Sequence, residues 1–479
     1  MKFYLDEHGC SKNQVDAEEI IVRLEDAGHE EVGSAEEADL VLVNSCGFIE
    51  SAKKESIDAV LGFKQAWPGK KVLLAGCLAQ RYAKELAEDL PEADGIVGNA
   101  DLGALPLAVA ELAQGLRPVI VPEAAASIGT VRRRRLLDWP GTAHVKITEG
   151  CSNNCSFCAI PLIRGRLRSR PVADIVAEIA DLVSPTRAGP AIRELVLVGQ
   201  DLGSFGKDLP GKDLPGKDLP GKGGGEVREG MPLPNDRRLL PTFLEAISAL
   251  EGEFRLRVMY IHPDNFPRAI LPIMARDPRI LPYFDIPFQH ASAPLLKRMN
   301  RRGGAAEYLE LIAEIRKILP DAMLRSTFLL GFPGEDEEDF QALRDFQEKA
   351  RLDWLGSFSY SREDGTTAAT MKGRVPKKIV DARRAAVEEA QERITAERLR
   401  RFVGREIEVI VEEPLEDGED DFSIGRAWMQ APEVDGLTVL RGSFKPGSLV
   451  LARVLGVAGV DLDAEPIRVL AEAETRLPT

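Results

Sequence analysis

The sequence predicts an α/β protein of three domains. A doubly wound α/β domain is expected over residues 1–125, a partial TIM-like barrel over 137–370, and a small β-barrel over 402–470. Two observations lead to this division: strand and helix patterns alternate through the first two regions, and only short strand patterns remain in the third. The length of 479 residues suits about three domains of ordinary size.

The first domain is indicated by buried strands that alternate with helices. Asp39–Asn44 and Lys71–Gly76 are short apolar runs typical of parallel strands, and Asp16–Ala27 and Ala79–Asp89 have the periodicity of helices. Alternation of this kind favours a parallel sheet with helices on both faces.

Cys10, Cys46 and Cys77 each come at or just after the end of a predicted strand in this domain. The carboxyl ends of parallel strands form the edge at which such sheets bind ligands, so the three cysteines are expected to converge there. Considered alone, they are explained equally well as buried structural cysteines.

The central domain is expected to contain six strand–helix units, which is fewer than a complete TIM barrel has. Active residues of such barrels lie at the carboxyl ends of the strands. The predicted strands are His144–Thr148, Glu194–Gly199, Arg255–Ile261, Tyr283–Pro287, Leu324–Gly331 and Leu355–Tyr360.

Two segments of the chain are predicted to be surface loops without a catalytic or binding role. Lys207–Gly221 repeats Lys-Asp-Leu-Pro-Gly three times, and its prolines and glycines prevent a helix or strand from growing. The basic run Arg132–Arg135, in the linker before the central domain, is interpreted as a solvated loop.

The last part of the chain is predicted to be a long helix followed by a small β-barrel. Lys377–Phe402 has a charged helical pattern, and strands such as Glu406–Val411 and Leu449–Val454 follow it. From Phe402 onwards there are 7 Lys and Arg against 16 Asp and Glu. Five of these acids are expected in one loop: Glu416, Asp417, Glu419, Asp420 and Asp421.

Overall composition points to a cytoplasmic protein with a basic partner. No apolar run is long enough to span a bilayer, and the N-terminus lacks the residue order of a signal peptide. The formal net charge of -15 argues against binding of nucleic acid through a broad basic surface. Complementary charge would instead favour association with a basic protein.

The most informative motif is CxxxCxxC, formed by Cys151, Cys155 and Cys158 directly after the first barrel strand. Three closely spaced thiolates can bind three irons of a four-iron cluster and leave the fourth iron open. An open iron can chelate S-adenosylmethionine (SAM), and an electron from the cluster can then release a 5'-deoxyadenosyl radical. A zinc site, with a distant histidine as fourth ligand, is the alternative, and would suit a zinc-stabilised RNA-binding protein.

The motif and its continuation through Arg170 resemble the radical SAM methylthiotransferases. The order of domains is also similar, with a terminal barrel of the TRAM type. This resemblance implies that Cys10, Cys46 and Cys77 bind a second four-iron cluster, which holds the sulfur or methylsulfide to be transferred. It also implies two [4Fe-4S] clusters and SAM as cofactors, and an electron donor such as a flavodoxin or ferredoxin.

Other site residues follow from the position of barrel strands. Gln200 comes after the second strand, where radical SAM proteins hold the amino group of SAM, and Phe157 is expected near the adenine. Gln289 and His290 end the fourth strand and could face the cavity, although a lone histidine is more often structural. No catalytic acid, base or nucleophile is assigned.

Three stretches resemble the branch of this family that modifies a ribosomal protein: Asp285–His290, Gly356–Thr366 and Gly425–Gly436. Enzymes of the family that act on transfer RNA adenosines usually have Gln-Ser in place of Gln289-His290. The resemblance implies methylthiolation of the β-carbon of an aspartate in small-subunit ribosomal protein twelve, with two SAM per product. Transfer RNA is the alternative substrate, and the acidic terminal domain disfavours it.

Overall fold

The computed structural model describes residues 1–124, 128, 131–187, 189–209, 238–417, 420–473 and 475–476. Within them the chain forms two compact units, each assembled from separate segments. The first unit contains Met1–Leu137, Lys146–Arg170 and Ser361–Ala369. The second contains Asp138–Val145, Pro171–Tyr360 and Thr370–Thr479. From residue 210 onwards, the Lys207–Gly221 repeat lies outside the described residues.

The first unit is built on a six-stranded parallel sheet in the order β2-β1-β3-β4-β5-β6. Since the strand order reverses between β1 and β3, this is the point at which such sheets bind ligands. The strands are β1 (Lys2–Glu7), β2 (Glu30–Glu31), β3 (Leu40–Ser45), β4 (Lys71–Gly76), β5 (Gly95–Gly98) and β6 (Val119–Ile120).

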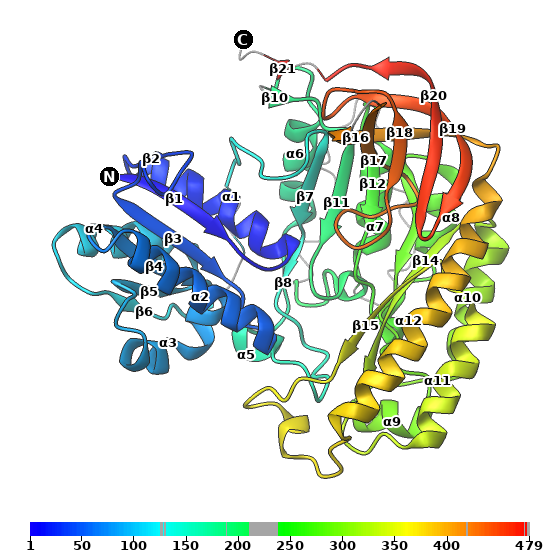
Figure 1. Cartoon of the computed structure of the whole chain (residues 1–479), viewed down its shortest axis with the longest axis horizontal. Helices are drawn as coiled ribbons and strands as arrows, with labels where there is room; N and C mark the ends of the chain where they lie inside the picture. Colours follow the sequence, from blue (N-terminus) through cyan, green and yellow to red (C-terminus); the bar gives the residue numbers. More distant parts are fainter. Residues whose placement is uncertain are drawn as a thin grey trace, which may run out of the picture. The chain divides into compact units, whose positions relative to one another are not determined.

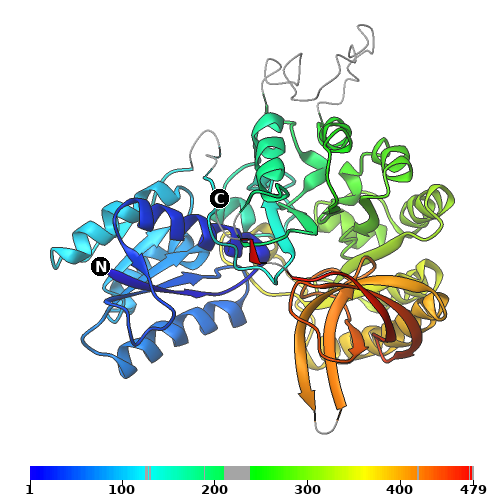
Figure 2. The ribbon, with the colours of Figure 1, turned by 90° about the horizontal axis from the view of Figure 1, so that it is seen from above.

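Helices cover both faces of this sheet, which confirms the doubly wound prediction (Figure 2, blue to cyan). The first and fourth helices share one apolar core with the sheet, and the second and third share the other. The helices are α1 (Ser11–Asp26), α2 (Glu50–Ala66), α3 (Cys77–Asp89) and α4 (Leu105–Ala113), with η1 (Leu102–Ala104) before α4.

Helix α1 begins five residues before the predicted start at Asp16. Its first turns are buried although they are polar, and they include Ser11 and Asn13. A prediction based on apolar periodicity misses such turns, because their partners are hydrogen-bonding groups rather than a hydrophobic core.

The second unit contains the open sheet β15-β14-β13-β12-β11-β7, as predicted for an incomplete barrel (Figure 1). Strand β12 ends at Val258, three residues earlier than predicted, and Tyr260 just beyond it has a left-handed backbone (φ 57°) that cannot continue a strand. The strands are β7 (Thr142–Lys146), β11 (Glu194–Val198), β12 (Arg255–Val258), β13 (Ile280–Asp285), β14 (Met323–Leu330) and β15 (Trp354–Ser359).

Helices of the second unit connect the sheet strands, and a longer helix leads to the last domain. No helix among the described residues is long and apolar enough to cross a membrane. The helices are α6 (Val172–Leu182), α7 (Leu240–Ser248), α8 (Ile270–Arg276), α9 (Ala293–Arg298), α10 (Ala305–Ile318), α11 (Glu337–Ala350) and α12 (Lys377–Leu399), with η2 (Leu202–Ser204), η3 (Pro263–Asn265) and η5 (Arg400–Phe402). The short helix η4 (Thr367–Thr370) lies mostly in the first unit.

The chain ends in a closed five-stranded barrel in the order β16-β17-β18-β20-β19, as predicted (Figure 2, orange to red). The acidic cluster was expected in a loop, and this was wrong for most of it: Glu416 pairs with Asp421 and Asp417 with Asp420 across the β16–β17 hairpin. The strands are β16 (Glu406–Asp417), β17 (Asp420–Ala427), β18 (Thr438–Arg441), β19 (Leu449–Ala458) and β20 (Asp461–Ala471), and β21 (Thr475–Arg476) pairs with β10 (Gly189–Pro190).

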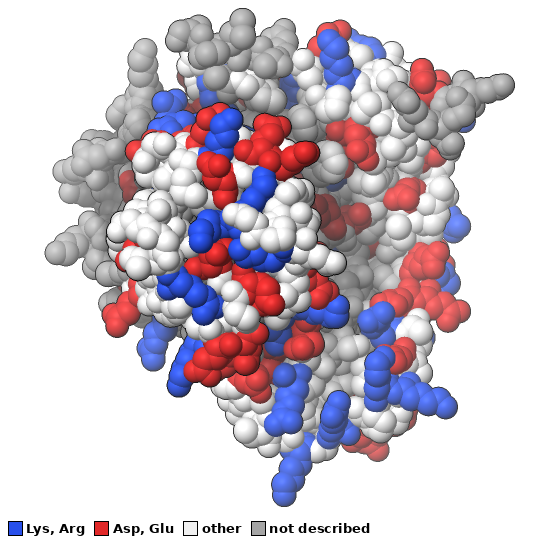
Figure 3. All heavy atoms as spheres, turned by 60° about the vertical axis from the view of Figure 1, so that its left-hand side comes forward, with Lys and Arg blue, Asp and Glu red and all other residues white. Residues whose placement is uncertain are grey.

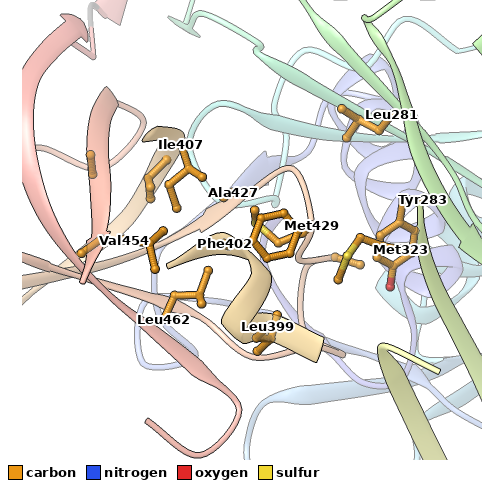
Figure 4. Close-up of a cluster of buried hydrophobic side chains, with 14 of the residues drawn as sticks. Leu281, Tyr283, Met323, Leu399, Phe402, Ile407, Ala427, Met429, Val454 and Leu462 are labelled. Atoms are coloured by element: carbon orange, nitrogen blue, oxygen red, sulfur yellow. The ribbon is translucent and has the colours of Figure 1, made fainter. Parts of the chain in front are cut away.

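The terminal barrel shares a core with the central sheet. Figure 4 shows Tyr283 and Met323 of the sheet on one side of Met429, and Phe402 on the other; all four are buried. Beside this core lies a fully buried ion network, in which Glu194 pairs with Arg257 at 2.6 Å and with Arg426 at 3.2 Å. Packing of this kind holds the two domains of the second unit together.

Candidate functional site

All six cysteines belong to the first unit, although they are separated by up to 148 positions in the sequence. Cys10 is the N-cap of α1, directly after the β1 loop, and Cys46 follows β3. Cys77 is the first residue of α3, directly after β4. These three cysteines therefore stand at the carboxyl ends of adjacent strands, on the edge where the strand order reverses.

The three cysteine loops approach one another so closely that glycine is required between them. A Cβ atom added to Gly9 would lie 3.4 Å from the sulfur of Cys46. A Cβ atom added to Gly47 would lie 2.7 Å from the backbone of Cys77. A side chain at either glycine would therefore collide with a neighbouring cysteine loop.

The side chain of Asn13 connects the three loops. Its Nδ2 donates to the carbonyl of His8 at 2.8 Å and to that of Ser45 at 3.0 Å, and its Oδ1 accepts from the thiol of Cys77 at 3.4 Å. On the other side, Nδ2 of Asn99 lies 3.3 Å from the same sulfur. Sequence analysis missed Asn13, because a lone asparagine in a helix carries no spacing signal.

Protonation of the thiols reflects their surroundings. Burial raises the pKa of Cys46 to about 11 and also raises the pKa of Cys77. Desolvation acts in the same direction on Cys10, but the charges of Lys12 and Arg164, together with backbone hydrogen bonds from Asn13 and Lys12, outweigh it and lower the pKa of Cys10. Binding of iron needs thiolates, so the thiols of Cys46 and Cys77 would each release a proton as they bind metal.

The CxxxCxxC loop is closed at its base by a short antiparallel pair, β8 (Thr148–Glu149) with β9 (Arg168–Ser169), and contains the short helix α5 (Ile160–Ile163). Inside it, the amide of Cys151 donates to the carbonyl of Gly165 at 3.1 Å, and that of Cys158 to the carbonyl of Cys155 at 3.0 Å. The loop is thus fixed at both ends of the motif.

Gly150 is required where this loop begins, and Gly150→Ala is expected to impair iron binding severely. Its φ is +68°, and an added Cβ would lie 2.2 Å from the carbonyl oxygen of Arg166. The control is Gly62→Ala in the exposed part of α2, where nothing lies within 4 Å and helix propensity improves. Iron per chain after anaerobic reconstitution is the measurement, and full iron content in Gly150→Ala would contradict the expectation.

A buried ion network joins this loop to α1. Arg164 pairs with Asp16 and with Glu149, both at 2.9 Å, and Lys146 pairs with Glu149 at 2.9 Å and with Asp16. Burial disfavours all these charges, but the mutual attraction is stronger: it raises the pKa of Lys146 and Arg164 and lowers that of Glu149. Lys146, Glu149 and Arg164 are therefore ionised.

Within the first unit, a buried carboxylate ties the segment Ser361–Ala369 to α2 and α3. Glu363 pairs with Arg81 at 2.6 Å and with Lys53 at 3.1 Å, and Arg81 also donates to the carbonyl of Gly47 at 3.1 Å. Burial raises the pKa of Glu363, but bonds from Ser361, Arg81 and Lys53 lower it overall. Part of the Gly356–Thr366 stretch thus lies beside the loop of Cys46.

The basic linker is a loop in which Arg132, Arg134 and Arg135 are exposed, as expected, but Arg133 is buried, which corrects the expectation for that residue. Arg133 forms a buried pair with Glu18 of α1, Arg134 pairs with Asp26 at 2.5 Å, and Arg135 pairs with Glu31 at 2.6 Å. The partners lie more than a hundred positions away, so the sequence could not reveal them. Figure 3 shows basic and acidic side chains interspersed over one face of the molecule.

The remaining predicted site residues differ in their surroundings. Gln200 follows β11, and both polar atoms of its side chain are buried without a hydrogen-bond partner among the described residues. An unsatisfied buried amide at the carboxyl end of a barrel strand suits a ligand. Phe157 is half-buried within the cysteine loop, and Gln289, beyond β13, has a left-handed backbone (φ 69°), a strained conformation for a residue other than glycine.

His290 is completely buried. Its Nδ1 accepts from the amide of Ser292 at 3.1 Å, and its Nε2 has no partner among the described residues. Burial lowers its pKa to about 3. The ring is therefore neutral in the folded protein at physiological pH.

Stability is expected to fall as pH falls below 6.5, the ordinary pKa of histidine. Below that value the unfolded chain binds a proton that buried His290 does not accept until about pH 3, at a cost of about 1.4 kcal/mol per pH unit. His290→Asn keeps an acceptor for Ser292 and should reduce the slope of unfolding free energy between pH 6.5 and 5.5. Equal slopes for the two proteins would contradict this expectation.

Comparison with known proteins places the chain in a family. Residues 2–98 match a family described as uncharacterized protein family UPF0004, 217–346 match the Radical SAM superfamily, and 403–467 match the TRAM domain. The ribosomal protein uS12 methylthiotransferase RimO of Treponema denticola is 44% identical, over 96% of this chain and 99% of its own. The protein of that name from Kineococcus radiotolerans is 40% identical, over 96% of each chain.

The chain belongs to the RimO methylthiotransferase family. RimO proteins are radical SAM enzymes, so SAM and a four-iron cluster are cofactors of this family. Among solved structures, the radical SAM methyltransferase TsrM from Kitasatospora setae, with tryptophan and a SAM analogue bound, superposes with a TM-score of 0.51 at 14% identity. That likeness covers 74% of this chain and 72% of TsrM, and it concerns the fold alone.

Proposed function

We propose that this RimO family member attaches a methylthio group to the β-carbon of an aspartate in ribosomal protein uS12, using two SAM molecules per product. The observation that carries the proposal is the gathering of two cysteine triplets, each with a separate backbone frame, into one compact unit. The relatives that support the substrate span nearly the whole chain.

Each triplet would hold one four-iron cluster. In such a cluster every thiolate binds a different iron, so the sulfurs stand further apart than the ligands of a single ion. Among the described residues, no three His, Cys, Asp or Glu side chains could hold one metal ion. The match to radical SAM relatives over nearly the whole chain favours clusters over the zinc site that the sequence left open.

The two triplets would divide the work. Cys151, Cys155 and Cys158 would hold the cluster that binds SAM, and Cys10, Cys46 and Cys77 the cluster that carries the sulfur. Together the bound groups supply the radical that removes a β-hydrogen and the methylsulfide that replaces it. An electron donor such as a flavodoxin or ferredoxin would provide reducing equivalents.

Three side chains expected from the sequence, Gln200, Phe157 and Gln289, would orient SAM. Gln200 offers an amide whose oxygen and nitrogen lack partners, and the oxygen would accept a hydrogen bond from the amino group of SAM. Phe157 presents a half-buried ring within the cysteine loop that can pack on the adenine. Gln289 follows the fourth strand of the sheet and has a strained, left-handed backbone, and its amide would be a further contact for SAM.

Charge supports a protein substrate over transfer RNA. The terminal domain, the part of a TRAM enzyme that would meet RNA, has more than twice as many acidic as basic residues. Of the four linker arginines, Arg133, Arg134 and Arg135 pair with carboxylates and offer no basic patch to phosphates. A basic ribosomal protein suits such a surface better.

The test is a direct comparison of the two substrates. Anaerobically reconstituted enzyme would be incubated with SAM, a reductant, and either purified uS12 or total transfer RNA. We expect a methylthio mass increase on the uS12 aspartate, located by fragmentation, and none in digested nucleosides. Modification of adenosine without modification of uS12 would contradict the proposal, and enzyme lacking both cysteine triplets is the control.

A further inference from the structure

We propose that Arg164 is a positioning residue for the cluster site of Cys10, Cys46 and Cys77, provided by the loop that carries the other three cysteines. Its Nη2 donates to Oδ1 of Asn13 at 2.5 Å, the oxygen that also accepts from the thiol of Cys77. This inference rests on the proposed function, because it assumes that these cysteines hold a cluster.

Arg164 is firmly built into its own loop. It lies six positions after Cys158, and its amide donates to the carbonyl of Ile160 at 2.8 Å as the cap of α5. Its Nη1 donates to Glu149, which directly precedes Gly150. The side chain is 3% exposed, so its position is set by these contacts rather than by solvent.

The guanidinium also contacts Asn13 and Asp16 of α1, the helix that begins directly after Cys10. Asn13 holds the loops before Cys10 and Cys46 through the carbonyls of His8 and Ser45, so a bond to Asn13 acts on the whole triplet. Nη2 of Arg164 also pairs with Asp16, one turn further along α1. One planar side chain thus joins both cysteine frames, and only arginine has the forked donors for these partners.

Charge gives Arg164 a second effect. Arg164 and Lys146 balance Asp16 and Glu149, so the network is neutral before any cysteine is ionised. Thiolates of a bound cluster would add negative charge, and Arg164 is the cation of this network that bonds to Asn13 beside Cys77. A cation at that place stabilises the more negative, reduced state of a cluster.

The experiment isolates the N-terminal cluster by using the Cys151→Ala, Cys155→Ala, Cys158→Ala background. In that background, Arg164→Met is compared with Arg164→Lys by iron per chain, EPR spectrum and midpoint potential. We expect Arg164→Met to shift the midpoint to more negative values. Arg164→Lys should keep the midpoint near that of the background but change the EPR spectrum, since lysine has the charge without the fork.

Controls separate this role from a general need for Arg164 in folding. Arg134→Met removes an exposed cation paired with Asp26 and should leave midpoint and spectrum unchanged. If Arg164→Met does not fold, a double variant that keeps the charge balance, Arg164→Met with Glu149→Gln, replaces it. Folded protein that has a shifted midpoint potential, or that holds no iron, supports the inference. The inference is overturned if the midpoint potential is unchanged in Arg164→Met, or in the double variant Arg164→Met with Glu149→Gln. It is also overturned if the EPR spectrum is unchanged in Arg164→Lys. Wild-type enzyme that holds two normal clusters but does not modify uS12 would instead contradict the proposed function.

Discussion

Replacement of Cys10, Cys46 and Cys77 by alanine is expected to abolish methylthio transfer to uS12, while SAM cleavage to 5'-deoxyadenosine continues. The loop of Cys151, Cys155 and Cys158 has its own closure by β8 and β9, and none of these bonds involves the replaced thiols. Chromatography of the nucleoside product and the intact mass of uS12 measure the two activities separately.

The matched variant replaces Cys151, Cys155 and Cys158 and should lose both activities, because the radical is needed for transfer. Comparison of the two triple variants excludes a simple effect of removing three thiols. If the first variant loses SAM cleavage although its remaining cluster has a normal spectrum, the proposed division between the triplets is wrong.

Arg426→Met is expected to destabilise the second unit by about 3–5 kcal/mol, the range for breaking a buried ion pair from one side. Arg426 is fully buried; its Nη1 pairs with Glu194 at 3.2 Å, its Nη2 donates to Thr142 at 2.9 Å, and its Nε pairs with Glu412. Methionine fills much of the volume but leaves Glu412 without its cation. Denaturant unfolding, followed by circular dichroism, measures the change.

An exposed arginine of the same barrel is the control. Arg453 pairs with Glu406 at 2.9 Å, but both side chains are about half exposed. Arg453→Met should therefore change the free energy of unfolding by less than about 1 kcal/mol. A similar decrease in the free energy of unfolding in the two variants would show that burial does not determine how much the Arg426 network contributes to stability.

The sequence was sufficient for the parts of the fold that depend on apolar pattern. The runs that became β3 and β4 are wholly or almost wholly buried, and such runs predict parallel strands in order. The start of α1 was not predictable, because Asn13 and its neighbours are buried by hydrogen bonds to other loops. The β16–β17 hairpin was longer than expected, because strand pairing continues through charged residues.

The cysteines could be located from the sequence because each follows a strand, and the resemblance to a family then gave them roles. The residues that join them could not be found in this way. Asn13 and Arg164 are 151 positions apart, and neither has a distinctive spacing. Likewise, Arg133 looked like part of a solvated run, although its buried partner Glu18 lies 115 positions earlier.

Iron content is the most direct test of the claim that one compact unit holds two clusters. Anaerobically reconstituted wild-type protein should contain about eight iron atoms per chain, and each cysteine triple variant about four. Mössbauer spectra should assign all of this iron to four-iron clusters. Zinc in place of iron, or about four iron atoms in the wild-type protein and in one of the two variants, would contradict the claim.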